Sequence, residues 1–205
     1  MIKLKKVIGI TGGIACGKST ITDYLKAQGY FVLNADVIAK ELSEMHQPVY
    51  KKIVEAFGKE YLKDNLELDR EKLGKLIFQN TSARIKLNRI SHPIIVEEIQ
   101  KKIKNATEKL IFLELPLLFE AKLMDLCDTI VCVYVSKETQ MQRLMKRDQI
   151  SYAYAMQKIE SQLSLDEKRQ QSDYCILAED WNTTYPQIEK ILKEIKGEIK
   201  NGSNC

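Results

Sequence analysis

Five short apolar runs divide the sequence, and stretches with helical periodicity separate each run from the next. The runs span residues 7–10, 31–33, 110–113, 130–135 and 174–177. Because they are apolar at consecutive positions, they are typical of strands buried on both faces, as in a parallel sheet covered by helices. The pattern predicts an α/β fold with a five-stranded parallel sheet flanked by helices.

Capping residues mark the starts of several helices between and after these strands. Ser136, Ser164 and Thr184 are predicted N-caps, and the last two have a Glu or Gln three residues later, the spacing of a capping box. The final helix is predicted to pack on the sheet through one apolar face and to fray at Gly197. That face consists of Ile188, Ile191, Leu192, Ile195 and Ile199.

The connection after the second strand contains no strand-like run over about seventy residues, far more than a simple βαβ crossover needs. Three apolar stripes at helical spacing predict helices there, the second after the turn at Gly58 and the third after Pro93. The stripes are Val49, Ile53, Val54 and Phe57; Leu73, Leu76 and Ile77; and Ile95, Ile99 and Ile103.

These patterns predict a nucleotide-binding core with two added parts. The core comprises residues 1–36, 106–148 and 170–200, and residues 37–105 form a helical, substrate-binding insertion. Residues 149–169 form a small lid, and residues 201–205 are expected to be a disordered tail.

Composition narrows the class of protein further. The chain has 205 residues, 44% of them hydrophobic, and a net charge of +4, which is typical of a globular domain and does not argue for a nucleic-acid partner. No apolar segment is long enough to predict a membrane span. Five cysteines without Cys-x-x-Cys spacing predict reduced thiols and a cytoplasmic location.

The strongest chemical signal follows the first strand. Residues 12–19 read Gly-Gly-Ile-Ala-Cys-Gly-Lys-Ser, which is the complete G-x-x-x-x-G-K-[ST] phosphate-loop pattern between a strand and a helix. Glycines let backbone N–H groups curl around phosphate oxygens, and the following helix adds its positive end. Lys18 is expected to reach the β- and γ-phosphates, and the Ser19 hydroxyl to ligate magnesium.

Further candidates stand where other predicted strands end, because ligands of open parallel sheets bind at that edge. Asp36 follows the second strand and is placed to accept a proton from a substrate hydroxyl. The alternative is that it only caps the helix containing Ile38, Leu42 and Met45. Glu114 ends the third strand, either near magnesium through a water molecule or as an ordinary strand-end carboxylate.

Arg143 and Arg147 are spaced i, i+4 after the fourth strand, so they share one helix face leading into the lid. They are candidates for neutralising a transferring phosphoryl group. The alternative is a solvated face on which Arg147 pairs with Asp148. The chain has two histidines, His46 and His92, too few to predict a metal site.

The order of motifs resembles the bacterial dephospho-CoA kinases over nearly the whole chain. The matching stretches are Thr11–Ile14 with Gly17–Thr20, Ala35–Ala39, His92–Ile95, Pro116–Glu120, Val135–Gln140, Arg143–Asp148, Asp166–Arg169 and Asp173–Tyr174. Pro-Leu-Leu-Phe-Glu at residues 116–120 and Glu-Thr-Gln at residues 138–140 are much more selective than the phosphate loop.

The resemblance implies a P-loop kinase fold and Mg²⁺-dependent transfer of the ATP γ-phosphoryl group to the ribose 3′-hydroxyl of dephospho-CoA, the last step of CoA synthesis. Implied catalytic residues are Asp36, Lys18, Arg147 and Arg143. Implied ATP-binding residues are Gly13, Ile14, Ala15, Cys16, Gly17, Lys18, Ser19 and Thr20. Implied substrate-binding residues are Thr11, Asp36, His92 and Phe119. Ser19, with Glu114 through water, is the implied magnesium site.

The sequence departs from the family pattern in four places. Ala15 and Cys16 stand where Gly and Ser are usual, Asn34 where many members have Asp, and Glu114 where Asp is frequent. Ala-Glu-Asp at residues 178–180 stands where the family tends to carry Asn-x-Gly beside the adenine. Other hypotheses are a kinase for a nucleoside monophosphate or another small hydroxyl acceptor, and a nucleotide-switched binding protein. A monomer or weak homo-oligomer is expected.

Overall fold

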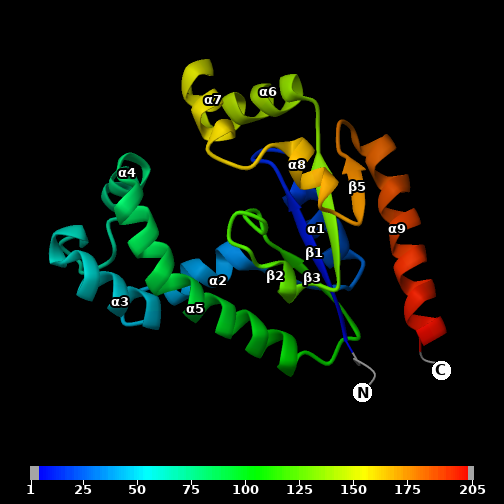
Figure 1. Cartoon of the computed structure of the whole chain (residues 1–205), viewed down its shortest axis with the longest axis horizontal. Coiled ribbons are helices and arrows are strands. Elements are labelled where there is room, and N and C mark those ends of the chain that lie inside the picture. Colours follow the sequence, from blue (N-terminus) through cyan, green and yellow to red (C-terminus); the bar gives the residue numbers. More distant parts are fainter. Residues whose placement is uncertain (1–4, 203–205) are drawn as a thin grey trace. The chain divides into compact units, whose positions relative to one another are not determined.

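All five predicted apolar runs form strands in the computed structural model, which describes residues 5–202. The strands are β1 (Lys6–Gly12), β2 (Phe31–Asn34), β3 (Leu110–Glu114), β4 (Thr129–Tyr134) and β5 (Tyr174–Leu177). Their order is β2-β3-β1-β4-β5, with β1 in the middle (Figure 1). β1 pairs in parallel with β3 and β4, and β4 pairs in parallel with β5. The prediction of an α/β fold with a parallel sheet is confirmed.

Two helices supply most of the apolar cover that the sheet needs. α1 (Lys18–Ala27) contributes Ile21 and Leu25 to the main core, and α9 (Trp181–Gly202) contributes one apolar stripe. Of the predicted stripe, Ile188, Ile191, Leu192 and Ile195 are buried, while the side chain of residue 199 lies outside the described set. Figure 1 shows α9 running beside β5. Burial of apolar side chains on parallel strands therefore explains why both strand faces are hydrophobic.

Three helices follow β4. α6 (Lys137–Asp148) and α7 (Tyr152–Glu160) pack on each other through Met141, Leu144 and Ala155. α8 (Leu165–Gln170) packs on β1 and β4 and carries a fully buried lysine, Lys168. The predicted lid, residues 149–169, thus consists of α7 and most of α8. A short 3₁₀ turn (Met124–Leu126) precedes β4.

The chain divides into two compact units, one formed by the described residues up to Leu33 and from Thr107, the other by Asn34–Ala106. The second unit begins three residues before the predicted insertion and ends one residue after it. It holds α2 (Ala35–Leu42), α3 (Pro48–Phe57), a 3₁₀ turn (Lys59–Tyr61), α4 (Arg70–Gln79) and α5 (Thr81–Asn105). Its own apolar cluster is built around Val49, Ile53, Leu68 and Leu73.

The helix predicted to begin at Pro93 begins twelve residues earlier, so this prediction was wrong. Asn80 caps α5 by accepting a hydrogen bond from the Ala83 N–H at 3.0 Å. Pro93 lies inside the helix, where it removes one backbone donor. Apolar contacts of Ile90 and Ile94, on either side of the proline, hold both halves in one core. Tertiary packing therefore overrides the breaking tendency of proline.

The predicted start and end of the final helix were also wrong. α9 begins at Trp181, because Asp180 accepts a hydrogen bond from the Thr183 N–H at 3.1 Å. The helix continues through Gly197 to Gly202, so residues 201 and 202 of the expected tail are helical, and residues 203–205 lie outside the described part. Within residues 5–202, no helix has both the length and the apolar character needed to cross a bilayer.

Candidate functional site

The phosphate loop depends on two glycines with positive φ. Gly12 ends β1 with φ +144°, and a Cβ there would lie 2.1 Å from the Val133 carbonyl oxygen. Gly17 precedes α1 with φ +88° and gives the helix no side-chain cap. Since no side chain occupies this helix N-terminus as a cap, its backbone N–H groups and positive end are suited to an anion. The loop thus has the shape that its motif predicts.

Lys18 is held inside this loop. Its side chain is buried, and its ammonium donates hydrogen bonds to the carbonyl oxygens of Gly12 at 3.1 Å and Gly13 at 2.7 Å. A cation fixed by backbone acceptors beside a helix N-terminus adds to the positive potential there. This arrangement is chemically suited to polyphosphate.

The middle of the loop is shaped by two residues that depart from the family pattern. Ala15 has φ +60°, a left-handed conformation that a side chain disfavours and that the usual glycine adopts freely. The Cys16 thiol is fully buried, and this burial raises its pKa despite the opposing influence of Lys18. Cys16 is therefore a protonated packing residue of the loop.

Two glutamines that the sequence analysis did not single out hold the loop from outside. The Gln140 side-chain amide on α6 donates to the Ile14 carbonyl at 2.9 Å, and the Ile14 N–H donates to the Gln162 side-chain oxygen at 3.0 Å. Gln140 belongs to the selective Glu-Thr-Gln stretch, which was the available signal for it. Gln162, between α7 and α8, carried none.

Oxygen donors suited to Mg²⁺ stand beside the first turn of α1. The Thr22 hydroxyl lies 3.1 Å from both the Ser19 carbonyl oxygen and a buried Glu114 carboxylate oxygen. Ser19 itself is exposed. Magnesium bound with nucleotide phosphates takes one or two protein oxygens and keeps several waters, so a serine hydroxyl and a nearby carboxylate fit it. Among residues 5–202, no group of three His, Cys, Asp or Glu side chains forms a cage for a metal.

The loop after β3 is fixed from two sides. The Thr11 hydroxyl, fully buried, donates to the Pro116 carbonyl oxygen at 3.4 Å, and the Lys168 ammonium donates to the same oxygen at 3.2 Å. Lys168 also pairs with Glu120 at 2.8 Å. Phe119 is buried within this loop. Thr11 and Phe119 thus shape the loop, and their predicted substrate contacts stay predictions.

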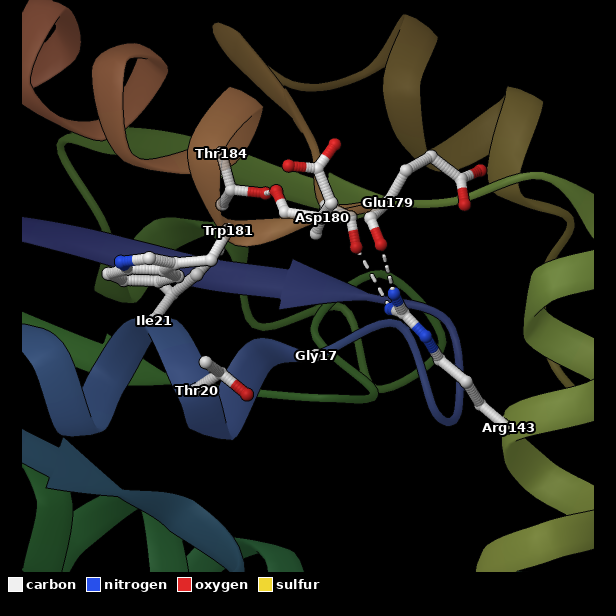
Figure 2. A pocket seen from close by; sticks show the side chains of 9 residues that line it. Gly17, Thr20, Ile21, Arg143, Glu179, Asp180, Trp181 and Thr184 are labelled. Atoms are coloured by element: carbon white, nitrogen blue, oxygen red, sulfur yellow. Dashed lines mark hydrogen bonds between the residues drawn. The ribbon is translucent and has the colours of Figure 1, made fainter.

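A cavity of about 310 Å³ opens beside the start of α1 (Figure 2). Its lining comes from α1, from α6 and from the segment that joins β5 to α9. The lining residues are Gly17, Thr20, Ile21, Arg143, Ala178, Glu179, Asp180, Trp181 and Thr184. We call it the base pocket, because its volume suits a small ligand and Gly17 and Thr20 of the phosphate loop form one wall.

Arg143 forms another wall of the base pocket. Its guanidinium donates to the carbonyl oxygens of Ala178 at 2.9 Å and Glu179 at 2.6 Å, as the dashed lines in Figure 2 show. A charged planar donor bound to two carbonyls is strongly oriented. The structure therefore places Arg143 in the lining of the base pocket, whereas the sequence analysis predicted that it would face a transferring phosphoryl group.

An aromatic cluster adjoins the same pocket. Trp181, at the start of α9, is 41% exposed, and its ring lies edge-on to Tyr24 with centroids 5.3 Å apart. Tyr24 also meets Tyr185 edge-on at 5.6 Å. No motif pointed to Trp181, because a lone tryptophan carries no spacing pattern.

Arg147 pairs with its neighbour, as the alternative interpretation proposed. Its side chain is 56% exposed and lies 2.8 Å from a carboxylate oxygen of Asp148. Lys158 of α7 lies 2.8 Å from the other oxygen. The hydrogen bonds of Arg147 and Lys158 lower the pKa of Asp148 to about 2. This ion-pair triad joins the end of α6 to α7, and a catalytic role for Arg147 stays a prediction.

In the helical unit, Asp36 lies in the first turn of α2, but it is not the cap. Asn34 is the cap, because its side-chain oxygen accepts a hydrogen bond from the Val37 N–H at 3.0 Å. The Asp36 side chain is exposed, and α2 ends before Met45. The capping alternative for Asp36 was therefore wrong, and Asn34 keeps a helix-capping function where the family often has a carboxylate.

His92 lies within α5, half-buried, and burial lowers its pKa, which keeps the imidazole neutral near pH 7. It does not stand at a helix start as expected, since α5 begins at Thr81.

The comparisons with known proteins agree with one another. The sequence profile of the dephospho-CoA kinase family matches residues 6–183. A dephospho-CoA kinase from Bacillus cereus is 43% identical over 193 residues, which cover 92% of this chain and 96% of the relative.

Two solved structures are similar over nearly the whole chain. Dephospho-CoA kinase from Campylobacter jejuni has a TM-score of 0.69 and 30% identity, covering 95% of this chain and 99% of that one. TT1252 from Thermus thermophilus has a TM-score of 0.82 and 27% identity, with coverage of 95% and 97%. Since the family profile spans most of the sequence and includes the phosphate loop, this chain belongs to the dephospho-CoA kinase family.

Proposed function

We propose that this chain is a cytoplasmic kinase that transfers the γ-phosphoryl group of ATP to the ribose 3′-hydroxyl of dephospho-CoA, giving CoA and ADP. The observation that carries the proposal is a complete phosphate loop, with Lys18 bound inside it and a base pocket at its end, in a member of this family. Phosphoryl transfer depends mainly on positioning and charge neutralisation.

The phosphate loop and α1 supply the first of these requirements. Backbone N–H groups around Gly17 bind phosphate oxygens, and Lys18 exchanges its carbonyl partners for the β- and γ-phosphates. Ser19, with Glu114 through a water molecule, would hold Mg²⁺. The bound metal would supply positive charge next to the phosphates.

Asp36 has the second role. Its carboxylate accepts the proton of the 3′-hydroxyl while that oxygen forms a bond to the γ-phosphorus and the bond between the γ-phosphorus and the β,γ-bridging oxygen breaks. The charge left on ADP is neutralised by Lys18, beside the position that the metal would occupy. Arg147 would leave its pairing with Asp148 to bind the equatorial oxygens of the transferring group.

The test is release of ADP from MgATP by the purified chain, in parallel with dephospho-CoA, AMP, CMP or no acceptor. Stimulation by dephospho-CoA, with CoA identified by mass, is the expected result. Stimulation only by a monophosphate would replace the proposed acceptor, and nucleotide binding without transfer to any acceptor would favour a nucleotide-switched binding protein.

Asp36→Asn tests the assigned base. We expect kcat to fall by roughly 10²- to 10⁴-fold, the usual contribution of a general base, with an unchanged melting temperature. Glu71→Gln is the matched control, because Glu71 is also an exposed acid in the first turn of a helix of the same unit, α4. Equal kcat values for Asp36→Asn and the wild type would remove Asp36 from the mechanism.

A further inference from the structure

The segment that joins β5 to α9 is attached to α6 mainly through Glu179, and Ala178 adds one further contact. One Glu179 carboxylate oxygen accepts a hydrogen bond from the Ser136 N–H at 2.6 Å, and the other accepts one from the Thr139 hydroxyl at 2.6 Å. Ser136 is the N-cap of α6, so this carboxylate occupies the positive end of that helix. These hydrogen bonds lower the pKa of Glu179, which keeps it ionised.

The backbone of the same residue is bound by the same helix. Arg143, one turn after Thr139 on α6, donates to the Glu179 carbonyl oxygen at 2.6 Å. Figure 2 shows the Glu179 side chain leading away from the guanidinium while its backbone carbonyl faces it. One face of α6 therefore binds Glu179 at two separate points.

This double attachment fixes two walls of the base pocket relative to each other. Arg143 forms one wall and Ala178–Trp181 the other, and both line the cavity with Gly17. Without the Glu179 carboxylate, the described hydrogen bonds between α6 and this segment would be those that Arg143 donates to two backbone carbonyls. Charge-assisted hydrogen bonds are short and strong, so losing the two that Glu179 accepts would loosen the pocket even though the Arg143 contacts, which are also charge-assisted, remain.

The attachment also accounts for a departure from the family pattern. Glu179 is the middle residue of Ala178-Glu179-Asp180, which stands where Asn-x-Gly is usual, so the outer two residues here lack the usual groups. The pocket is shaped instead by backbone groups of this segment, which the hydrogen bonds between Glu179 and α6 hold in place.

We propose that Glu179 is a positioning residue for the nucleotide base: its carboxylate sets the affinity for ATP by holding Arg143 and the β5–α9 segment in register, without itself touching the nucleotide. This inference rests on the proposed ATP site. Because Glu179 acts on ground-state binding at the base, away from the transferring group, its removal raises Kd and KM for ATP together and leaves kcat nearly unchanged.

The test uses the full chain and the variants Glu179→Ala, Glu179→Gln and Thr139→Val. Trp181, the single tryptophan in the sequence, lines the pocket, so its fluorescence reports ATP binding without any transfer reaction. We expect Glu179→Ala to raise Kd and KM for ATP about tenfold, with kcat within about twofold of wild type and an unchanged KM for dephospho-CoA. Glu179→Gln should recover most of the affinity, since its amide oxygen still accepts a hydrogen bond.

Glu167→Ala is the matched control. The Glu167 carboxylate accepts hydrogen bonds from the N–H and the hydroxyl of Ser164 at the start of α8, the same pattern at a different helix. An equal loss of ATP affinity in this control, or wild-type ATP affinity in Glu179→Ala, would overturn the proposal. If Glu179→Ala does not fold, the Kd values for ATP of Thr139→Val and Glu179→Gln test the proposal in its place. Raised Kd in Thr139→Val supports the proposal, and unchanged Kd in both overturns it.

Failure of the proposed function would be recognisable separately. A wild-type chain that binds ATP without phosphorylating dephospho-CoA would contradict the proposed reaction, while the fluorescence titrations of the variants would still test Glu179. A wild-type chain without ATP binding would overturn both.

Discussion

The phosphate loop and the segment lining the base pocket, residues 178–181, are two parts of the proposed nucleotide site, and they are shaped by different means. The phosphate loop takes most of its form within eight residues, through Gly12 and Gly17 at positive φ and through a lysine bound to the loop's own carbonyls, with only Gln140 and Gln162 supporting it from outside. The base segment takes its form from a helix about forty residues earlier in the sequence, through Arg143 and through the contacts of Glu179 with Ser136 and Thr139.

This difference explains why one region has a motif and the other does not. Where the backbone curls tightly, sterics allow only particular residues at particular spacings, so the sequence records the shape. Where the shape depends on hydrogen bonds between distant segments, many residue pairs serve equally, and no local spacing reveals them.

The largest expected effect separates the two glycines of the phosphate loop. Gly12→Ala places a Cβ 2.1 Å from the Val133 carbonyl oxygen, a backbone atom that cannot move aside, in addition to positive-φ strain. We expect a loss of at least about 3 kcal/mol of stability, which corresponds to a Tm lower by roughly 6–12 °C.

Gly17→Ala is the comparison for that variant. The nearest atom to a Cβ there is Arg143 Nη1 at 3.7 Å, so only the left-handed strain of about 1–2 kcal/mol applies. Thermal melts of both variants decide the matter. Equal losses would mean that conformation, and not the contact with Val133, governs the loop.

A smaller effect, of opposite sign, is expected at Ala15. Because Ala15 has φ +60°, Ala15→Gly removes left-handed strain, and the gain exceeds the entropy lost by a more flexible unfolded chain. We expect about 0.5–1 kcal/mol of added stability, or roughly 1–4 °C in Tm. Ala39→Gly, inside α2, should instead lower Tm, since glycine is unfavourable within a helix. A lower Tm for Ala15→Gly would show that the loop carries no relievable strain.

The smallest effect concerns Cys16. Because burial raises the pKa of its thiol, we expect iodoacetamide to label Cys16 more slowly than the partly exposed Cys127 and Cys175 at pH 7.5, with activity retained, as measured by peptide mass spectrometry. Rapid labelling of Cys16 with loss of ATP binding would contradict a packing role.

The raised pKa of Cys16 also makes the stability of the fold depend on pH. The unfolded thiol deprotonates near its ordinary pKa of about 8.5 while the folded thiol does not. The stabilising contribution of the protonated thiol is therefore complete below that pH and decreases above it.

The sequence predicted the strands well and the helix limits less well, for identifiable reasons. All five strands were found, because each is a short apolar run set between longer stretches with helical periodicity. Capping by Ser136 and Ser164 was also confirmed, since those hydrogen bonds are local. The α5 start failed at Pro93, where packing outweighs a local breaking tendency, and the α9 start failed because Asp180 is an equally good cap four residues before the expected one.

The candidate site divides in the same way. Sequence analysis pointed to the phosphate-loop residues and to Arg143, whose role at the phosphoryl group stays a prediction. It did not identify Thr22, Gln140, Gln162 or Trp181. Each of these residues contacts a partner that is far away in the sequence, or belongs to no recognisable spacing pattern. Asp36 was singled out by its position after a strand, and only the Asn34 cap removed the competing interpretation.

The strand order has a consequence for how the chain is made. β1 is synthesised first, yet its neighbours β3 and β4 begin about a hundred residues later, with Lys6 opposite Leu110 and Ile8 opposite Thr129. Since synthesis proceeds at roughly 5–20 residues per second, the central strand is made on the order of 5–20 s before its first partner in the sheet. During that interval the helical unit, which has its own apolar cluster, is complete and able to form. Until β3 and β4 are made, the newborn chain thus exposes the apolar residues of its central strand, and chaperones that bind such segments would protect it.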